Sequence, residues 1–238
     1  MPALDDKTVL IIGRGSGIAR AIAMAVLEAG GNVIAAGRHQ ESLADAYRGT
    51  SVGVETVDVT DESSISALAD RIGGRLDHVV STASARARGG YADLTGDLVS
   101  ASFATKVTGP LLLAKHFGKK LPAGGSFLFM SGATALKPTP GMLAVAATNA
   151  AVDAVTAGLA VELAPVRVNA ISPGTIDTGA YDALGEERKA AMFAAKSASN
   201  PARRIGTAQD IASVAVTALT SGFLTGVSIP VDGGEHLV

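Results

Sequence analysis

The feature that most constrains the fold is a strand, a glycine turn and a helix close to the N-terminus. Val9–Ile12 is a continuous β-branched and leucine run, typical of a strand buried on both faces. Gly13, Gly15 and Gly17 follow, and apolar residues then recur at helical spacing over 18–29. Glycines let the backbone approach a pyrophosphate, and the N–H groups and dipole of a helix start favour its charge. The stretch predicts half of a dinucleotide site, although an ordinary strand–turn–helix corner would share the glycines.

The rest of the chain alternates between the two kinds of element. Further strands are expected at 32–36, 52–57, 77–80, 126–130, 166–171 and 227–231, with helices between them. Such alternation implies a mostly parallel sheet covered by helices on both faces. We therefore predict an α/β fold, a Rossmann-type doubly wound parallel sheet of about seven strands, as a single domain over residues 1–238. Residues 178–199 are expected to form a mobile lid over the substrate.

Composition excludes several classes of function. The 20 basic and 22 acidic residues nearly cancel, so neither nucleic acid nor an anionic membrane is an expected partner. Cysteine is absent, which excludes disulfides and a thiolate nucleophile, and no histidine spacing suggests a metal site. Residues 1–7 lack the pattern of a signal peptide, so a cytoplasmic protein is expected. Asn149, Asp153 and Glu162 interrupt the apolar stretch 143–166, which favours a buried or interface helix over a membrane span.

The end of the second strand predicts the nucleotide. An acidic residue there would bind a ribose 2′-hydroxyl, whereas an arginine would accept a 2′-phosphate. The strand ends Gly37-Arg38-His39, with no carboxylate before Glu41, and Arg14 adds a second positive charge. We therefore expect NADP(H) to be preferred over NAD(H). The alternative is that Arg38 is merely an exposed arginine at a strand end.

Four motifs, in order, resemble those of the short-chain dehydrogenase/reductase family over essentially the whole chain. They are the glycine loop 13–19, the pair Asp58-Val59, the segment 169–178 and the C-terminal 225–234. The resemblance implies a nicotinamide cofactor and a small-molecule carbonyl or alcohol substrate. The cofactor-binding residues expected from it and from the nucleotide argument are Gly13, Arg14, Ser16, Gly17, Ile18, Arg38, Asp58, Val59, Lys106, Asn149, Pro173, Gly174, Ile176 and Thr178.

The chemistry of the family does not transfer directly. Its members use a tyrosine as acid, a lysine four residues later, a carbonyl-polarising serine and an upstream asparagine. Here the resemblance places Val145 at the tyrosine position and Asn149 at the lysine position. The serine is Ser131, although the spacing could equally place Gly132 there. A valine has no proton to give, so another donor is required.

Lysine and asparagine have exchanged places, because Lys106 occupies the position of the family's asparagine. We predict that Ser131, Lys106 and Asn149 form the catalytic set, with Lys106 supplying charge or a proton. A lysine pKa of about 10.4 in water would fall on burial into a range useful for acid catalysis. The alternatives are that Lys106 is a surface lysine or only a cofactor ligand.

Other polar side chains are weaker candidates. Tyr91 and Tyr181 could bring a phenol into the pocket, but each is more often a packing or lid residue. Arg86 and Arg88 could bind an anionic or enolised substrate, although loop arginines are usually just solvated. Ser131 lacks the G-x-S-x-G setting of a hydrolase nucleophile.

Two functions remain open at this stage. The first is an NADP(H)-dependent oxidoreductase with a non-standard proton donor. The second is a catalytically inactive nucleotide-binding sensor or partner subunit, which would have no need of the segment resembling the nicotinamide site. The small, apolar residues of the helix at 142–163 suit contact between subunits, so a homodimer or homotetramer is expected.

Overall fold

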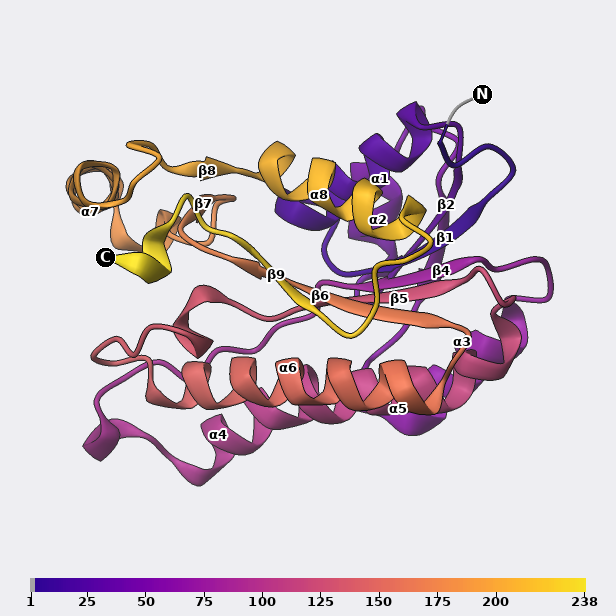
Figure 1. Ribbon diagram of the computed structural model, residues 1–238, viewed down its shortest axis with the longest axis horizontal. Helices are drawn as coiled ribbons and strands as arrows, with labels where there is room; N and C mark the ends of the chain where they lie inside the picture. Colours follow the sequence, from indigo (N-terminus) through magenta and orange to yellow (C-terminus); the bar gives the residue numbers. More distant parts are fainter. Residues whose placement is uncertain (1–2) are drawn as a thin grey trace.

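The computed structural model describes residues 3–238 (Figure 1). Residues 1–2, part of the segment in which no signal peptide was expected, lie outside the described residues. The main sheet contains β1 (Thr8–Ile12), β2 (Asn32–Gly37), β3 (Gly53–Thr56), β4 (His78–Ser81), β5 (Ser126–Met130), β6 (Arg167–Pro173) and β9 (Ser228–Val231). The helices are α1 (Gly17–Glu28), α2 (Gln40–Ala46), α3 (Glu62–Arg71), α4 (Gly96–Phe103), α5 (Gly109–Phe117), α6 (Leu143–Glu162), α7 (Glu186–Ser199) and α8 (Ala208–Thr220).

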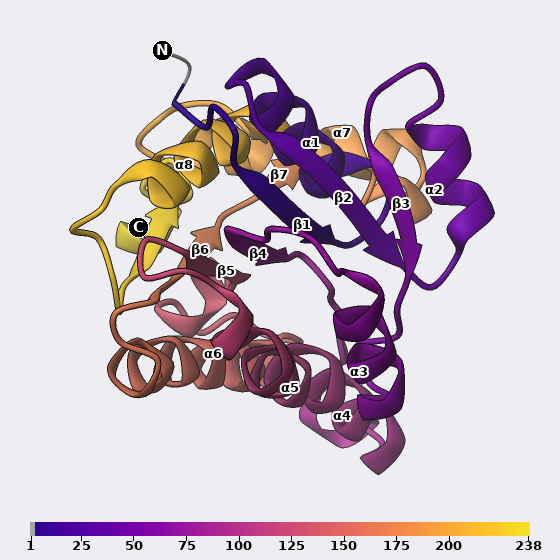
Figure 2. The ribbon, with the colours of Figure 1, turned by 90° about the vertical axis from the view of Figure 1, so that its right-hand side faces the viewer.

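The predicted sheet is confirmed. Its seven strands run in the order β3-β2-β1-β4-β5-β6-β9, and every pairing is parallel (Figure 2). The strand order reverses between β1 and β4, where Ile12 pairs with Ser81 at the carboxyl ends. In doubly wound sheets this is the point at which a crevice opens for a ligand.

Helices cover both faces, and each face has its own apolar core. One core joins the sheet to α1, α2 and α8, and the other joins it to α3, α5 and α6. Figure 1 shows these groups above and below the sheet. Local signals fix several helix ends: Asp61 accepts a hydrogen bond from Ser63 N at 2.9 Å and so caps α3. Thr207 and Asp210 form a reciprocal capping box at the start of α8.

The helix expected across residues 98–112 differs from a regular one. A π-helical turn (Ala104–Thr108) lies between α4 and α5, and Gly109 N donates to Ala104 O. Such turns insert one extra residue per turn and are frequent at functional sites. The turn contains Lys106, whose side chain is buried.

The predicted lid region contains more than one element. A 3₁₀ turn (Asp182–Leu184) precedes α7, and a small second sheet, β7 (Ile176–Asp177) with β8 (Gly206–Thr207), brackets this region. Sequence periodicity did not indicate this two-residue pairing.

Within residues 3–238, α6 alone has the length and hydropathy of a membrane span. One side of α6 contributes Val152 and Leu159 to the core under the sheet, as expected of a core helix.

Candidate active site

The carboxyl ends of β1, β2 and β4 lie so close together that Gly13 and Gly37 have no room for a Cβ. A Cβ on Gly13 would lie 2.1 Å from Thr82 Oγ1, and one on Gly37 would lie 2.6 Å from Gly13 O. Thr82 N donates to Ile12 O at 2.8 Å, which holds β4 against the turn. Glycine is therefore required at both positions. The turn leaves its backbone open at the predicted crevice, as a pyrophosphate site requires.

The start of α1 is prepared for an anion. Ser16 is the N-cap residue but makes no capping hydrogen bond, and the first turn contains no acidic residue. Gly17 has a φ of +56°, and a Cβ there would lie 3.1 Å from Thr178 Cβ. The glycine loop and the predicted nicotinamide segment, Pro173–Thr178, therefore lie side by side. The N–H groups of α1 and the exposed Arg14 fit a diphosphate between them.

Arg38 and Asp58 lie at the next two strand ends. Arg38 is exposed, and its charge helps to lower the pKa of the Asp58 carboxyl. The larger cause is Thr60, whose hydroxyl and backbone N–H donate to Asp58 Oδ1 at 2.7 and 2.9 Å. The side chains of Val59 and Ile176 are buried in the two cores. The motif match gave no sign that these two side chains belong to the apolar cores.

Lys106 lies at the carboxyl end of β5, against Ser131, and is only 6% exposed. Its Nζ donates to Ser131 O at 3.1 Å and to Asn149 Oδ1. The alternative that Lys106 is a surface lysine is therefore wrong, because its side chain is buried within the π-helical turn. Burial, and then the positive charge of Arg86, lower the pKa of Lys106 from 10.5 to about 7, against the opposing effect of Asp153.

Asn149 connects the expected catalytic residues. Its Nδ2 donates to Thr134 Oγ1 at 2.8 Å, while its backbone O accepts from Ser131 Oγ at 3.1 Å. A Cβ on Gly132 would lie 2.6 Å from Asn149 Nδ2, so this glycine makes room for the amide. Ser131, Lys106 and Asn149 thus form one hydrogen-bonded cluster, built from three elements. The Ser131 hydroxyl is directed at the α6 backbone rather than at open space.

The comparisons with known proteins agree with this architecture. A family model described as enoyl-(acyl carrier protein) reductase matches residues 12–236. A curated relative, the short-chain dehydrogenase/reductase ucsE of Acremonium sp, is 31% identical, over 98% of this chain and 96% of the relative. This chain belongs to the short-chain dehydrogenase/reductase family.

Two solved structures extend the comparison. A small-chain dehydrogenase in complex with NADPH is 33% identical with a TM-score of 0.83, covering 98% of this chain and 100% of that one. The MalC reductase/Diels-Alderase from Malbranchea aurantiaca is 27% identical with a TM-score of 0.92, covering 100% and 99%. The short-chain dehydrogenase/reductase family comprises oxidoreductases that use nicotinamide cofactors and act on small molecules. The resemblance identified from the sequence motifs is confirmed for the family and the fold.

The remaining candidates for proton donation lie apart from the cluster. Tyr91 is 85% exposed, in a 3₁₀ turn. Tyr181 packs edge-on against Phe193 of α7, with a centroid separation of 5.7 Å, and the guanidinium of Arg88 lies 5.7 Å from its ring. Val145 is buried at 5% exposure and contributes no polar group. Neither phenol is in the hydrogen-bonded cluster of this dehydrogenase/reductase.

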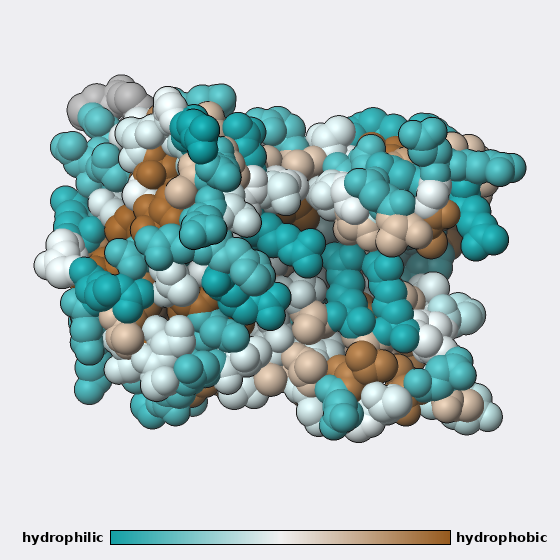
Figure 3. Space-filling model, turned by 180° about the vertical axis from the view of Figure 1, so that it is seen from behind, coloured by the Kyte–Doolittle hydropathy of each residue, from teal (hydrophilic) through white to brown (hydrophobic). Residues whose placement is uncertain are grey.

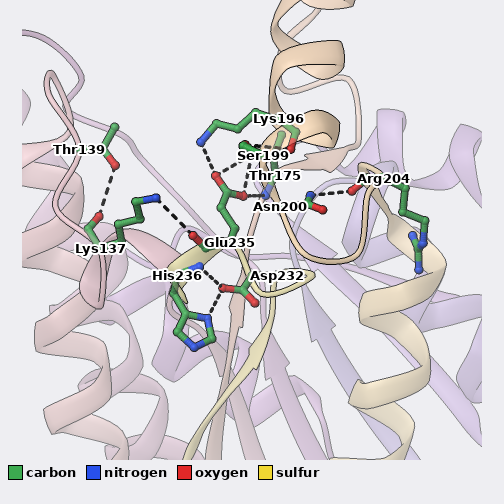
Figure 4. A network of polar contacts seen from close by, with 10 residues as sticks. All are labelled: Lys137, Thr139, Thr175, Lys196, Ser199, Asn200, Arg204, Asp232, Glu235 and His236. Carbon is green, nitrogen blue, oxygen red and sulfur yellow. Dashed lines mark hydrogen bonds and ion pairs between the residues drawn. The ribbon is translucent and has the colours of Figure 1, made fainter. Parts of the chain in front are cut away.

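Glu235 contacts the predicted nicotinamide segment, a contact that sequence reasoning missed. Its carboxylate accepts from Thr175 N at 2.8 Å, from Thr175 Oγ1 at 2.9 Å and from Lys196 Nζ (Figure 4). Lys137 Nζ reaches Glu235 O at 3.5 Å, and Asp232 binds the backbone of His236 at 3.0 Å. The C-terminal turn therefore joins the nicotinamide segment to α7. The only sequence signal near Glu235 is the Asp232-Gly233-Gly234 turn. This motif does not identify Thr175 or Lys196, which are distant in sequence, as contacts of Glu235.

Proposed function

We propose that this chain is an NADP(H)-dependent oxidoreductase that reduces a carbonyl or oxidises an alcohol, with Lys106 as its proton donor. The supporting observation is the burial of Lys106 between Ser131 and Asn149, where a pKa of about 7 makes both protonation states accessible near neutrality. General acids work best when their pKa is close to the operating pH.

Counting donors indicates which proton is transferred. A neutral amine has two N–H groups, and both are needed by Ser131 O and Asn149 Oδ1. The ammonium form has a third N–H, for which no acceptor lies among the described residues. This third proton is therefore the one available to an oxygen that develops negative charge. Asn149 and Ser131 fix the position of Nζ through the other two.

Ser131 has a second proposed role. Its hydroxyl donates to Asn149 O in this structure, so polarising a substrate carbonyl requires a χ1 rotation. Such a rotation costs only one neutral hydrogen bond, of about 1 kcal/mol. Both Ser131 and Lys106 would then donate toward the same substrate oxygen.

The cofactor would be held by residues that already fit it. The α1 N-terminus and Arg14 would bind the diphosphate, Arg38 a 2′-phosphate, and the backbone of Pro173–Thr178 the nicotinamide side. NADPH, when bound, supplies the hydride. We assign these roles from the fit of the glycine loop and from the positive charges of the two arginines. Within residues 3–238 neither arginine has an ion-pair partner, and the carboxylate on which Arg38 acts, Asp58, is hydrogen-bonded to Thr60.

Three further parts of the proposal concern the whole molecule. Residues 1–238 form a single domain in which 178–199 close over the substrate, with α7 held through Lys196. The chain forms a homodimer or homotetramer through the exposed face of α6, which includes Ala147, Ala150, Ala154 and Val161. It acts on a small molecule in the cytoplasm.

The test is NADPH oxidation with a panel of quinones, diketones and aryl ketones. Turnover by the wild type, reduced by about 10²- to 10⁴-fold in Lys106→Met at saturating cofactor, would support the donor role. Lys115→Met, at an exposed lysine of α5, is the matched control and should keep its turnover. Unchanged turnover in Lys106→Met would remove Lys106 from the chemistry. Tight NADPH binding without oxidation of any compound would favour the second candidate, a nucleotide-binding sensor or partner subunit.

A further inference from the structure

The loop that follows β4, residues 82–90, presents two arginines to the crevice; we call it the cleft loop. Ala87 in its centre is 2% exposed, whereas Arg86 and Arg88 on either side are exposed. Ser102 Oγ donates to Ala85 O at 2.8 Å, and Gly89 N donates to Gly141 O at 3.0 Å. Both ends of the arginine pair are thus fastened, to α4 and to the segment before α6. The pair is held by the fold rather than carried on a free loop.

Arg86 lies among charged groups that belong to several other segments. Arg14 in the glycine loop and Tyr181 in the proposed lid act on its pKa, and its own charge acts on Lys106 in the π-helical turn. Surrounding protein atoms lower the pKa of Arg86, although the residue still reaches solvent. Figure 3 shows the surface hollowed, on the right, between the lobe of α7 and that of α4 and the start of α6, with hydrophilic side chains across the opening.

Nothing in residues 3–238 neutralises the pair. The surface arginines Arg48, Arg71 and Arg204 each form an ion pair with a carboxylate. By contrast, neither guanidinium of the cleft loop has a hydrogen-bond acceptor or ion-pair partner in the described part of the chain, and Arg88 stacks on Tyr181 instead. Like charges held together within a cleft repel each other, which an anion between them would relieve.

We propose that Arg86 and Arg88 form an anion-binding site at the mouth of the substrate cleft, so that the substrate is a carbonyl compound bearing a carboxylate or an enolate oxygen. This inference deepens the proposed oxidoreductase function and rests on it. The guanidinium fork binds such oxygens in a bidentate manner. The contact of Arg88 with Tyr181 places the lid over the bound anion, which the protein would then shield from water.

The test uses matched pairs of ketones that differ in charge. Cyclohexane-1,3-dione is an enolate at neutral pH, whereas its 2,2-dimethyl derivative lacks the acidic hydrogens between the two carbonyls and stays neutral. Benzoylformate is a carboxylate, and its methyl ester is uncharged. Binding of each compound to the protein saturated with NADP⁺ is measured by calorimetry, where no hydride is available and turnover is not needed. If the affinity difference between anion and neutral partner depends on the arginines only in the first pair, the anionic oxygen belongs to an enolate; if only in the second, it belongs to a carboxylate.

The variants are Arg86→Gln, Arg88→Gln and, as a matched control, Arg71→Gln at the exposed end of α3. We expect at least one anion to bind the wild type at least tenfold more tightly than its neutral partner. Arg86→Gln and Arg88→Gln should each lower the affinity for that anion by roughly tenfold to a hundredfold. The affinities for the neutral partner and for NADP⁺ should stay unchanged. Arg71→Gln should change neither.

Three results would overturn the inference. Neutral partners could bind the wild type as tightly as the anions, or neither anion could bind. Alternatively, Arg86→Gln and Arg88→Gln could lower the affinity for NADP⁺ as much as the affinity for the anion, which would assign both arginines to cofactor binding. Failure of the oxidoreductase function is distinguishable: it would appear as no NADPH oxidation with any of the four compounds, even where the charge-dependent binding is present.

Discussion

Replacing Lys106 with methionine should alter how the stability of this protein depends on pH. The side chain keeps a similar length but loses its amine. In the folded chain, burial and then Arg86 lower the pKa of Lys106 from 10.5 to about 7, and the unfolded chain has the ordinary value. One pKa unit corresponds to about 1.4 kcal/mol, so folding disfavours the ammonium form by about 5 kcal/mol.

The sign follows from which state binds the proton. Below pH 7 both states bind it, and the penalty is constant. Between pH 7 and 10.5 the unfolded chain binds it more than the folded one, so stability rises by about 1.4 kcal/mol per pH unit. Methionine lacks this contribution. The free energy of unfolding of the wild type, minus that of Lys106→Met, should therefore increase by about 2 kcal/mol between pH 7 and pH 9.

The assay is urea unfolding at the two pH values, followed by far-ultraviolet circular dichroism because the chain has no tryptophan. Other titrating groups cancel in the difference between the two proteins. Leaving Ser131 O and Asn149 Oδ1 without their donor adds a cost of about 1–3 kcal/mol each, which does not depend on pH. Lys115→Met should give the same difference from wild type at both pH values. An equal difference for Lys106→Met at pH 7 and 9 would refute the reasoning.

Three other substitutions test separate parts of the structure. Arg38→Asp should move the preference from NADPH toward NADH by about 10- to 100-fold in kcat/KM, because a carboxylate repels the 2′-phosphate; an unchanged ratio would remove Arg38 from the nucleotide site. Thr207→Ala should lower the free energy of unfolding by about 1 kcal/mol, since the hydroxyl caps α8, and no loss in a urea titration would contradict that cap. Burial raises the pKa of Glu235, but Lys196 and Thr175 outweigh this effect and the net pKa is lowered. The stabilisation from Glu235 is therefore present above the ordinary carboxyl pKa and lost as pH falls below it. At neutral pH, Glu235→Gln should speed proteolysis within α7 severalfold, because the contact with Lys196 is weakened. Equal cleavage rates in the two proteins would disprove the contact.

The sequence by itself determined the seven strands of the main sheet, and their alternation with helices. The run Val9–Ile12 and the following glycines act through local rules: side-chain periodicity and the space that a Cβ occupies. Alternation of strands and helices then leaves few topologies for a parallel sheet. Gly13 shows the limit of such rules: from the sequence, this glycine was explained by the approach of a pyrophosphate, whereas the contact that excludes a Cβ in the structure is with Thr82 Oγ1.

Tertiary structure decided the state of the functional groups. Lys106 and Asn149 are 43 positions apart, and a π-helical turn that no periodicity announces brings them together. The orientation of the Ser131 hydroxyl, and the joining of Thr175 to Lys196 by Glu235, likewise arise from packing between distant segments. A pKa depends on what surrounds a group after folding, and a sequence specifies those surroundings only through the completed fold. The identity of Lys106 was visible in the sequence, whereas its burial and its lowered pKa were not.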